Sequence, residues 1–322
     1  MNWACKTGLA ALILCGPAAS AQTTSCLERT IPAGVADEHG LRVGGLSAAD
    51  YRLKIGGKES PIVSLSRAPA PHRILILMDA RGNMQGPDGK RWKTAVSVAE
   101  GLAQSKQPDV TLALFVFGKK ANERVGFSAG NQAVRAKLDQ IGNNQKYYAE
   151  HVRGPSVLYD AIREALRSFG PMSPGDSIFA ITSDGHDESQ TSTRSATESL
   201  DSGGLRLFVM IFSLGYLEAT NVAVRDLANN TGGLVLQYPG GPDDPIGTNV
   251  GTEPDVISAF DAALPTFYSL MAQSDLLQIE LTSPLKKSTD LKLTLSKETS
   301  RRLKNANIFY QHRLEPCTPA RP

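Results

Sequence analysis

The sequence predicts an α/β protein with a doubly wound, mainly parallel sheet and helices on both faces. It also predicts a small β module built from the N- and C-terminal segments. Between His72 and about Ser274, apolar strands alternate with segments of helical periodicity, the pattern of a parallel sheet with crossover helices. On either side of that stretch, short runs of alternating apolar and polar residues indicate antiparallel strands.

The first strand of the central stretch is the continuous apolar run from Ile74 to Met78, as expected for a strand buried on both faces. Further apolar runs of strand length follow it along the chain. They predict strands at Val110–Phe117, Glu123–Phe127, Ser177–Thr182, Leu205–Phe212 and Leu234–Gln237.

Helical spacing separates most of these strands. The first helix is expected at Trp92–Gln104, where Val96, Ala99 and Leu102 share one face. The last should run from about Asp255 to Met271, and Pro265 is expected to interrupt it. The remaining helices are predicted at Ala133–Ile141, Val157–Phe169, Thr193–Leu200 and Asn221–Asn229.

The two flanking segments have strand and hairpin patterns. In the first, Tyr51, Leu53 and Ile55 alternate with polar residues before a Gly56-Gly57 turn. In the second, alternating runs begin at Leu277 and Leu291, and Asn307 to His312 forms a last candidate strand. The predicted organisation is a signal peptide at 1–21, an N-terminal β segment at 22–71, the α/β domain at 72–274 and a C-terminal β segment at 275–322 that packs with the N-terminal one.

The N-terminus has the pattern of a secretory signal peptide. Lys6 precedes an apolar run from Gly8 to Gly16, and Ala19-Ser20-Ala21 supplies the small residues of a cleavage site. The apolar run is shorter than the ~20 residues that a membrane-spanning helix needs. We therefore expect an exported protein, periplasmic or secreted, without a membrane span.

Cleavage after Ala21 would remove Cys5 and Cys15 and leave Cys26 and Cys317, one near each end. In an oxidising compartment such a pair predicts a disulfide. Two free, unrelated thiols are the alternative.

Composition excludes several classes of function. The net charge of +2 and the 6% aromatic content give no electrostatic or stacking basis for nucleic-acid binding. The sequence contains no G-x-G-x-x-G or P-loop motif for a nucleotide. It also has no G-x-S-x-G elbow, and its histidines lack metal-ligand spacing. We expect a protein that is not an enzyme.

The polar residues that carry the candidate site follow the strands, because ligands of open α/β sheets bind beyond the carboxyl ends of strands. The first strand ends in Met78-Asp79-Ala80-Arg81-Gly82-Asn83. The loop before the third helix contains Gly154-Pro155-Ser156. The strand that ends at Thr182 continues as Ser183-Asp184-Gly185-His186-Asp187.

These three segments, in this order, resemble the von Willebrand factor A (vWA) domain over residues 72 to 274. The resemblance is closest to the secreted bacterial branch of the family, and Thr231-Gly232-Gly233 followed by a strand also fits it. In that family a metal-ion-dependent adhesion site uses D-x-S-x-S, a threonine and a later aspartate. The bound divalent cation takes its last ligand from a carboxylate on a partner protein.

The resemblance implies that the metal-site positions of this chain are Asp79, Asn83, Ser156 and Asp184. Asn83 replaces a serine and offers an amide oxygen, while Ser156 keeps the hydroxyl of the threonine position. Arg81 replaces the other serine and makes the site degenerate, because arginine has no acceptor and is always protonated.

Two arrangements follow. In the first, the guanidinium of Arg81 replaces the metal and pairs with Asp79 and Asp184, which suits bidentate pairing. In the second, Arg81 swings outward and a weak site for Mg²⁺ or another divalent cation survives. No cofactor is required in the first arrangement.

The predicted function is that of an exported protein-binding module, for adhesion or scaffolding, whose partner contacts the carboxyl edge of the sheet. A structural subunit of an envelope complex, with no metal role, is the alternative, and an enzyme with an unrecognised site is a weaker one. Two further segments leave alternatives open. Tyr147-Tyr148 is either a loop packed by aromatic side chains or part of a contact rim. The long loop from Tyr238 to Pro254 is either mobile or functional. Its Asp243 and Asp244 are either ligands for a cation or solvated surface carboxylates.

Overall fold

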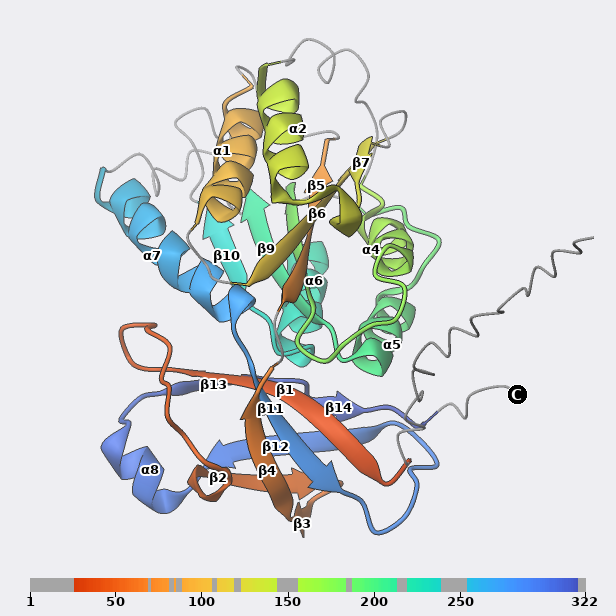
Figure 1. Cartoon of the computed structure of the whole chain (residues 1–322), viewed down its shortest axis with the longest axis vertical. Coiled ribbons are helices and arrows are strands. Elements are labelled where there is room, and N and C mark those ends of the chain that lie inside the picture. Colours follow the sequence, from red (N-terminus) through yellow and green to blue (C-terminus); the bar gives the residue numbers. More distant parts are fainter. Residues whose placement is uncertain are drawn as a thin grey trace, which may run out of the picture.

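The computed structural model describes residues 26–68, 71–80, 84, 89–105, 109–118, 123–143, 156–183, 187–212, 219–238 and 254–317. Figure 1 shows an upper part around a six-stranded sheet and a lower part with two four-stranded sheets. The predicted signal peptide at 1–21 lies outside the described residues. Within the described ranges, none of the helices has the length and apolar character to cross a membrane.

The large sheet is mixed but mainly parallel. Its strands are β5 (His72–Asp79), β6 (Val110–Phe117), β7 (Glu123–Val125), β8 (Ser177–Ser183), β9 (Arg206–Phe212) and β10 (Val235–Tyr238). They lie in the order β10-β9-β8-β5-β6-β7, and only the pairing of β7 with β6 is antiparallel. The predicted mainly parallel sheet is thus confirmed. The strand predicted at Glu123–Phe127 is shorter than expected, because it ends at Val125 before a 3₁₀ turn at Phe127–Ala129.

Helices cover both faces of this sheet, as predicted. One face packs against α1 (Lys90–Gln104), α2 (Asn131–Asn143) and α7 (Pro254–Ala272), and the other against α4 (Leu158–Arg167), α5 (Thr193–Gly203) and α6 (Ala219–Asn230). The alternation along β5 explains the two cores, since Ile74 and Ile76 point to the first face while Leu75 and Leu77 point to the second.

The predicted interruption of the last helix at Pro265 is wrong. Pro265 lies inside α7, which continues through it to Ala272. Buried side chains on both sides of the proline, Phe260 and Phe267, pack into the same core. The ring of Phe267 also makes edge contacts with Phe179 and Phe208 of the sheet. This packing outweighs the hydrogen bond that proline removes from a helix.

Both small sheets combine strands from the two flanking segments. Their strands are β1 (Glu28–Ala36), β2 (Tyr51–Ile55), β3 (Lys58–Ser60), β4 (Ile62–Arg67), β11 (Asp275–Glu280), β12 (Thr289–Leu295), β13 (Asn307–Tyr310) and β14 (Arg313–Leu314). The first sheet has the order β13-β1-β11-β4 and the second the order β14-β12-β2-β3. β1 pairs antiparallel with β11, and β2 pairs antiparallel with β12.

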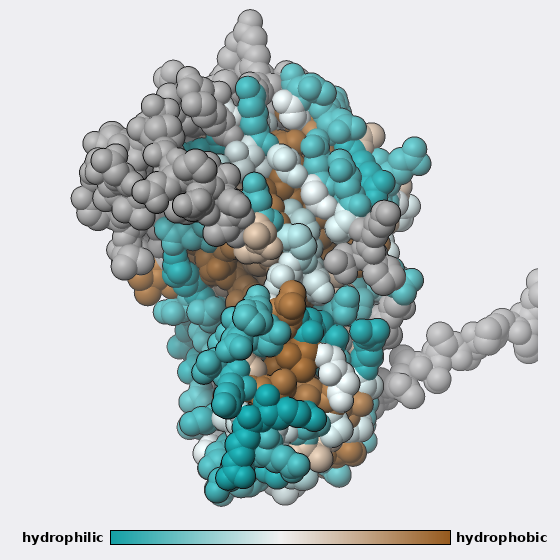
Figure 2. Space-filling view, turned by 90° about the vertical axis from the view of Figure 1, so that its left-hand side faces the viewer, coloured by the Kyte–Doolittle hydropathy of each residue, from teal (hydrophilic) through white to brown (hydrophobic). Residues whose placement is uncertain are grey.

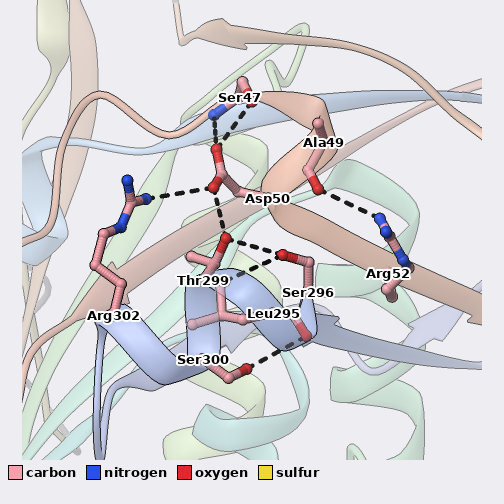
Figure 3. A network of polar contacts seen from close by, with 9 residues as sticks. All are labelled: Ser47, Ala49, Asp50, Arg52, Leu295, Ser296, Thr299, Ser300 and Arg302. Carbon is pink, nitrogen blue, oxygen red and sulfur yellow. Dashed lines mark hydrogen bonds and ion pairs between the residues drawn. The ribbon is translucent and has the colours of Figure 1, made fainter.

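A polar network joins the two flanking segments where β2 begins (Figure 3). The carboxylate of Asp50 accepts hydrogen bonds from the backbone and hydroxyl of Ser47 and from the hydroxyl of Thr299, at 2.6–2.8 Å. Thr299 belongs to α8 (Lys297–Arg302), and Arg302 of the same helix lies 3.3 Å from Asp50. These contacts, led by the hydrogen bond from Thr299, lower the pKa of Asp50.

On the side shown in Figure 2 the lower part is mainly hydrophilic, with an apolar area framed by polar side chains.

The two parts meet at the amino edge of the large sheet. Thr231 and Gln311 form an isolated bridge, and the backbone of His312 donates to Asn230 at 2.7 Å. Gly232 has φ +76°, and a Cβ there would lie 2.7 Å from the backbone of Tyr310. A glycine is therefore required where the chain after α6 approaches β13.

The predicted disulfide is present. Cys26 and Cys317 are bonded with their Cα atoms 5.6 Å apart, across 291 residues of sequence. The bond joins the beginning of the first flanking segment to the end of the second.

Candidate functional site at the carboxyl edge of the sheet

The candidate site is centred on Asp79, the last residue of β5. β5 lies between β6 and β8, where the strand order reverses, so Asp79 is at the topological switch point of the sheet. This edge is the upper one in Figure 1, away from the small sheets. The side chain of Asp79 is only 1% exposed, and a buried carboxylate needs hydrogen-bond partners.

Two hydroxyls from neighbouring segments supply such partners. Ser156 donates to Oδ2 of Asp79 at 3.1 Å, and Thr182 donates to the same oxygen at 3.0 Å. Ser156 precedes α4 and Thr182 lies near the end of β8. The predicted pair Asp79 and Ser156 is therefore brought together, across 77 residues of sequence.

The structure adds Thr182, which the sequence motifs did not indicate. Its position one residue before the end of β8 was the available signal, because side chains at strand ends converge on the switch point. A hydroxyl that donates to a carboxylate keeps lone pairs for a further partner. Thr182 therefore belongs with Asp79 and Ser156 as an oxygen donor of the site.

Two aspartates hold the segment after β8 against the start of α4. Asp187 accepts hydrogen bonds from the backbone amides of Leu158, at 2.7 Å, and Ser189, at 2.9 Å. Asp160 accepts from the amides of Gln190 and Thr191 at 2.9 Å each. The carboxylates at the N-terminus of α4 also interact favourably with the helix dipole. This arrangement fixes Ser156 beside Asp79.

The charge of Asp160 is stabilised by the same contacts. Burial acts to raise the pKa of Asp160. The hydrogen bonds from the Thr191 hydroxyl and from the amides of Gln190 and Thr191 outweigh burial and leave that pKa below its usual value. Asp160 is therefore ionised near neutral pH and holds the loop through charge-assisted hydrogen bonds.

The other sequence-predicted site residues lie outside the described residues. They are Arg81, Asn83 and Asp184. The segments around Tyr147-Tyr148 and around Asp243 and Asp244 also lie outside the described residues. The structure places Thr231-Gly232-Gly233 at the opposite edge of the sheet. The Thr231 hydroxyl accepts from the amide of Leu207, near the start of β9, at 3.0 Å. This segment therefore contributes to the contact with the small sheets and not to the candidate site.

The donor set around Asp79 suits a hard cation. One carboxylate and two hydroxyls supply oxygen atoms, the ligand type that Mg²⁺ prefers. Within the described ranges, no group of three His, Cys, Asp or Glu side chains is placed to hold a metal ion. A metal here would therefore depend on the hydroxyls and on Asn83 and Asp184.

Comparisons with known proteins complete the description of the chain. No family model matches it, and no curated protein matches it. Solved structures that it resembles include human Sec24c, a COPII-coat protein (TM-score 0.43, 10% identity, 77% of this chain and 44% of that one). The match to proximal thread matrix protein 1 of the mussel byssus (TM-score 0.48, 13% identity) covers 66% of this chain and 49% of that protein's chain. The match to a von Willebrand factor type A protein from Catenulispora acidiphila (TM-score 0.40, 11% identity) covers 91% of this chain and 74% of that protein's chain.

The chain spans less than half the length of the first two of these structures. All three TM-scores lie below 0.5.

Proposed function

We propose that this chain is an exported protein-binding module whose partner contacts the carboxyl edge of the large sheet around Asp79. The observation that supports this most is the position of Asp79, which is buried at the switch point and bonded by hydroxyls from two adjacent segments. Open α/β sheets bind their ligands at this point. The resemblance of the surrounding motifs to the vWA domain supports binding in place of catalysis.

The proposal includes a degenerate adhesion site with a built-in cation. In this arrangement the guanidinium of Arg81 pairs with Asp79 and Asp184 where a metal would otherwise lie. The repulsion between a fixed guanidinium and a metal ion beside it weakens metal binding by several kcal/mol, even at an effective dielectric of about 20. If a divalent cation does bind, Asp79, Ser156 and Thr182 would hold it with Asn83 and Asp184. It would then supply an open position for a carboxylate of the partner.

Titration with Mg²⁺ and Mn²⁺ tests the built-in cation. The full chain is expected to show no saturable micromolar binding, whereas the Arg81→Ser variant is expected to bind at least tenfold more tightly, because a charge repulsion of several kcal/mol is removed. Isothermal titration calorimetry measures both. Micromolar binding by the unchanged protein, lost on Asp79→Ala, would contradict the arrangement.

Partner capture with matched arginine variants tests the binding surface. Ser183 ends β8 at the carboxyl edge and is partly exposed, while Ser66 is exposed on β4 of the small sheets. Because an added arginine obstructs a contact only where the partner binds, Ser183→Arg is expected to lose a protein captured from envelope extract, and Ser66→Arg to retain it. Quantitative mass spectrometry of the captured proteins provides the measurement.

The same capture is run with a chelator. Loss of the captured protein in the chelator would show that a metal bridges the two proteins. Equal capture by both arginine variants would exclude the carboxyl edge as the contact surface. A change in melting temperature of Ser183→Arg without any change in capture would favour a structural role in an envelope complex.

A further inference from the structure

Two short segments carry the described chain from one part of the molecule to the other, one from β4 to β5 and one from α7 to β11 (Figure 1). They lie side by side, because the amide of Ala68 donates to the carbonyl of Ser274 at 3.0 Å. Two adjacent crossings have the geometry of a hinge, since both can bend about one line while each part keeps its own sheets.

Polar contacts hold the two parts together away from these crossings. His312 contacts Asn230 through its backbone amide, at 2.7 Å, and through its ring, at 3.2 Å. Gln311 donates to the backbone carbonyl of Asp201 at 3.1 Å. Phe309 of β13 adds apolar contact with the core under α7, which favours the closed form. We call this contact surface, together with the two crossings, the junction.

A cleft of about 530 Å³ interrupts the junction. Met172 and Pro174 line it on the side of the large sheet, and Glu28, Arg29 and Cys317 line it on the side of the small sheets. Because the junction is interrupted and rich in polar contacts, its separation exposes less apolar area than the unfolding of either core. Such a region can open without the rest of the fold.

Asp201, near the end of α5, is an acidic group that the junction buries. Its side chain is only 5% exposed, and both carboxylate oxygens are buried without a hydrogen-bond partner among the described residues. The C-terminal segment packs over it, with Gln311 bonded to its carbonyl and Leu314 and Glu315 on the wall of the same cleft. Separation of the two parts would remove this cover and return the carboxyl group to water.

Burial and the nearest charges together disfavour the ionised form of Asp201. Burial is the largest cause, and Glu315 a second, of a rise in the pKa of Asp201 to about 8, which Arg313 of β14 opposes. Glu28 and Arg29 of β1 line the same cleft with opposite charges. The closed form therefore keeps the proton of Asp201 at neutral pH, whereas a carboxyl group in water releases it.

We propose that the junction is a pH-sensitive hinge, in which loss of the proton of Asp201 favours separation of the two parts at the amino edge while each part stays folded. Opening releases one proton between the ordinary pKa of 3.8 and the raised pKa of about 8. In that window each pH unit therefore raises the ratio of open to closed molecules about tenfold through Asp201, and above it the ratio levels off.

Two histidines of the junction oppose this trend at lower pH. His312 lies against Asn230, and His72 begins β5 at the first crossing. Burial is the main cause that lowers the pKa of both, so each gains a proton more readily in the open form below about pH 6.5. The charged groups that act on His72 are Arg206, Asp176, Arg67 and Asp109. The effect of Asp201 should therefore appear alone above pH 6.5.

Hydrogen exchange of the full chain, followed by NMR spectroscopy at the amide of His312, tests the hinge, because that amide donates across the junction. After division by the intrinsic exchange rate, its exchange is expected to rise about twentyfold between pH 6.5 and pH 8.5. The amides of Leu77 in β5 and Leu277 in β11 should stay better protected at every pH, because they exchange only when one of the two parts unfolds.

Matched variants complete the experiment. Asp201→Asn is expected to abolish the rise at His312, since asparagine does not ionise. Asp226→Asn makes the same change on the exposed face of α6 and is expected to retain the rise.

A flat profile at His312 in the unchanged protein would overturn the proposal, as would a rise that Asp201→Asn retains. Equal protection of His312, Leu77 and Leu277 would also overturn it, because the whole chain would then unfold in place of the hinge opening. The junction lies at the edge opposite Asp79, so these outcomes are independent of the capture experiment.

Discussion

The Asp201→Asn variant is expected to be more stable than the unchanged protein at pH 8, by several kcal/mol. The pKa of Asp201 rises from 3.8 to about 8, chiefly through burial. Between these two pH values the unfolded chain is ionised while the folded chain retains the proton. The folded state therefore loses stability as pH rises through this window, on the order of 5 kcal/mol in total. Asparagine does not ionise and does not incur this loss.

Urea unfolding at a series of pH values measures the effect. The difference in the free energy of unfolding between Asp201→Asn and the unchanged protein should be small near pH 4. It should grow up to about pH 8 and then level off. Asp226→Asn, on the exposed surface of α6, should give a difference that stays flat with pH. A flat difference for Asp201→Asn would show that its carboxyl group is not buried as described.

Replacing Cys26 and Cys317 together by alanine is expected to lower the free energy of unfolding by on the order of 5 kcal/mol. The disulfide spans 291 residues of sequence, so the unfolded chain is closed into a very large loop. In the chain-entropy model, opening a loop of this length favours the unfolded state by about that amount. Chemical denaturation of the double variant beside the unchanged protein gives the value.

Reduction of the unchanged protein provides the matched control. Denaturation in the presence of a reducing agent should reproduce the stability of the double variant, while the double variant itself should not respond to the reducing agent. Equal stability of the oxidised protein and the double variant would contradict the expected contribution. Both alanine positions lie away from Asp79, so the carboxyl edge remains available as a reference.

Much of the fold follows from local pattern. The buried run at Ile74 to Met78 became the central strand β5, and the helical face of Val96, Ala99 and Leu102 is buried in α1. Such periodicity depends only on neighbours in sequence, so it can be recognised without a structure. The antiparallel direction of β7, which the sequence did not predict, and the continuation of α7 through Pro265, which it predicted wrongly, depend on packing against distant residues.

Some residues of the candidate site were also predicted from the sequence, while others were found only in the structure. The resemblance of the motifs to the vWA domain implied that Asp79 and Ser156 belong to one site, and the two side chains are hydrogen-bonded. Thr182 and the loop held by Asp160 and Asp187 came only from the structure. Their roles consist of hydrogen bonds between segments far apart in the chain, which no local pattern encodes.

The sequence by itself determined the order of most strands and helices and the two cysteines of the disulfide, and it proposed the carboxyl edge as the place of the candidate site. The tertiary structure alone decided the pairing of the flanking strands and the position of Asp201. Aspartate after a helix is unremarkable in a sequence. Its pKa rises only when the packing of α5 against the C-terminal segment buries its oxygens without a hydrogen-bond partner among the described residues, because desolvation depends on the whole surroundings of a group and not on its neighbours in the chain.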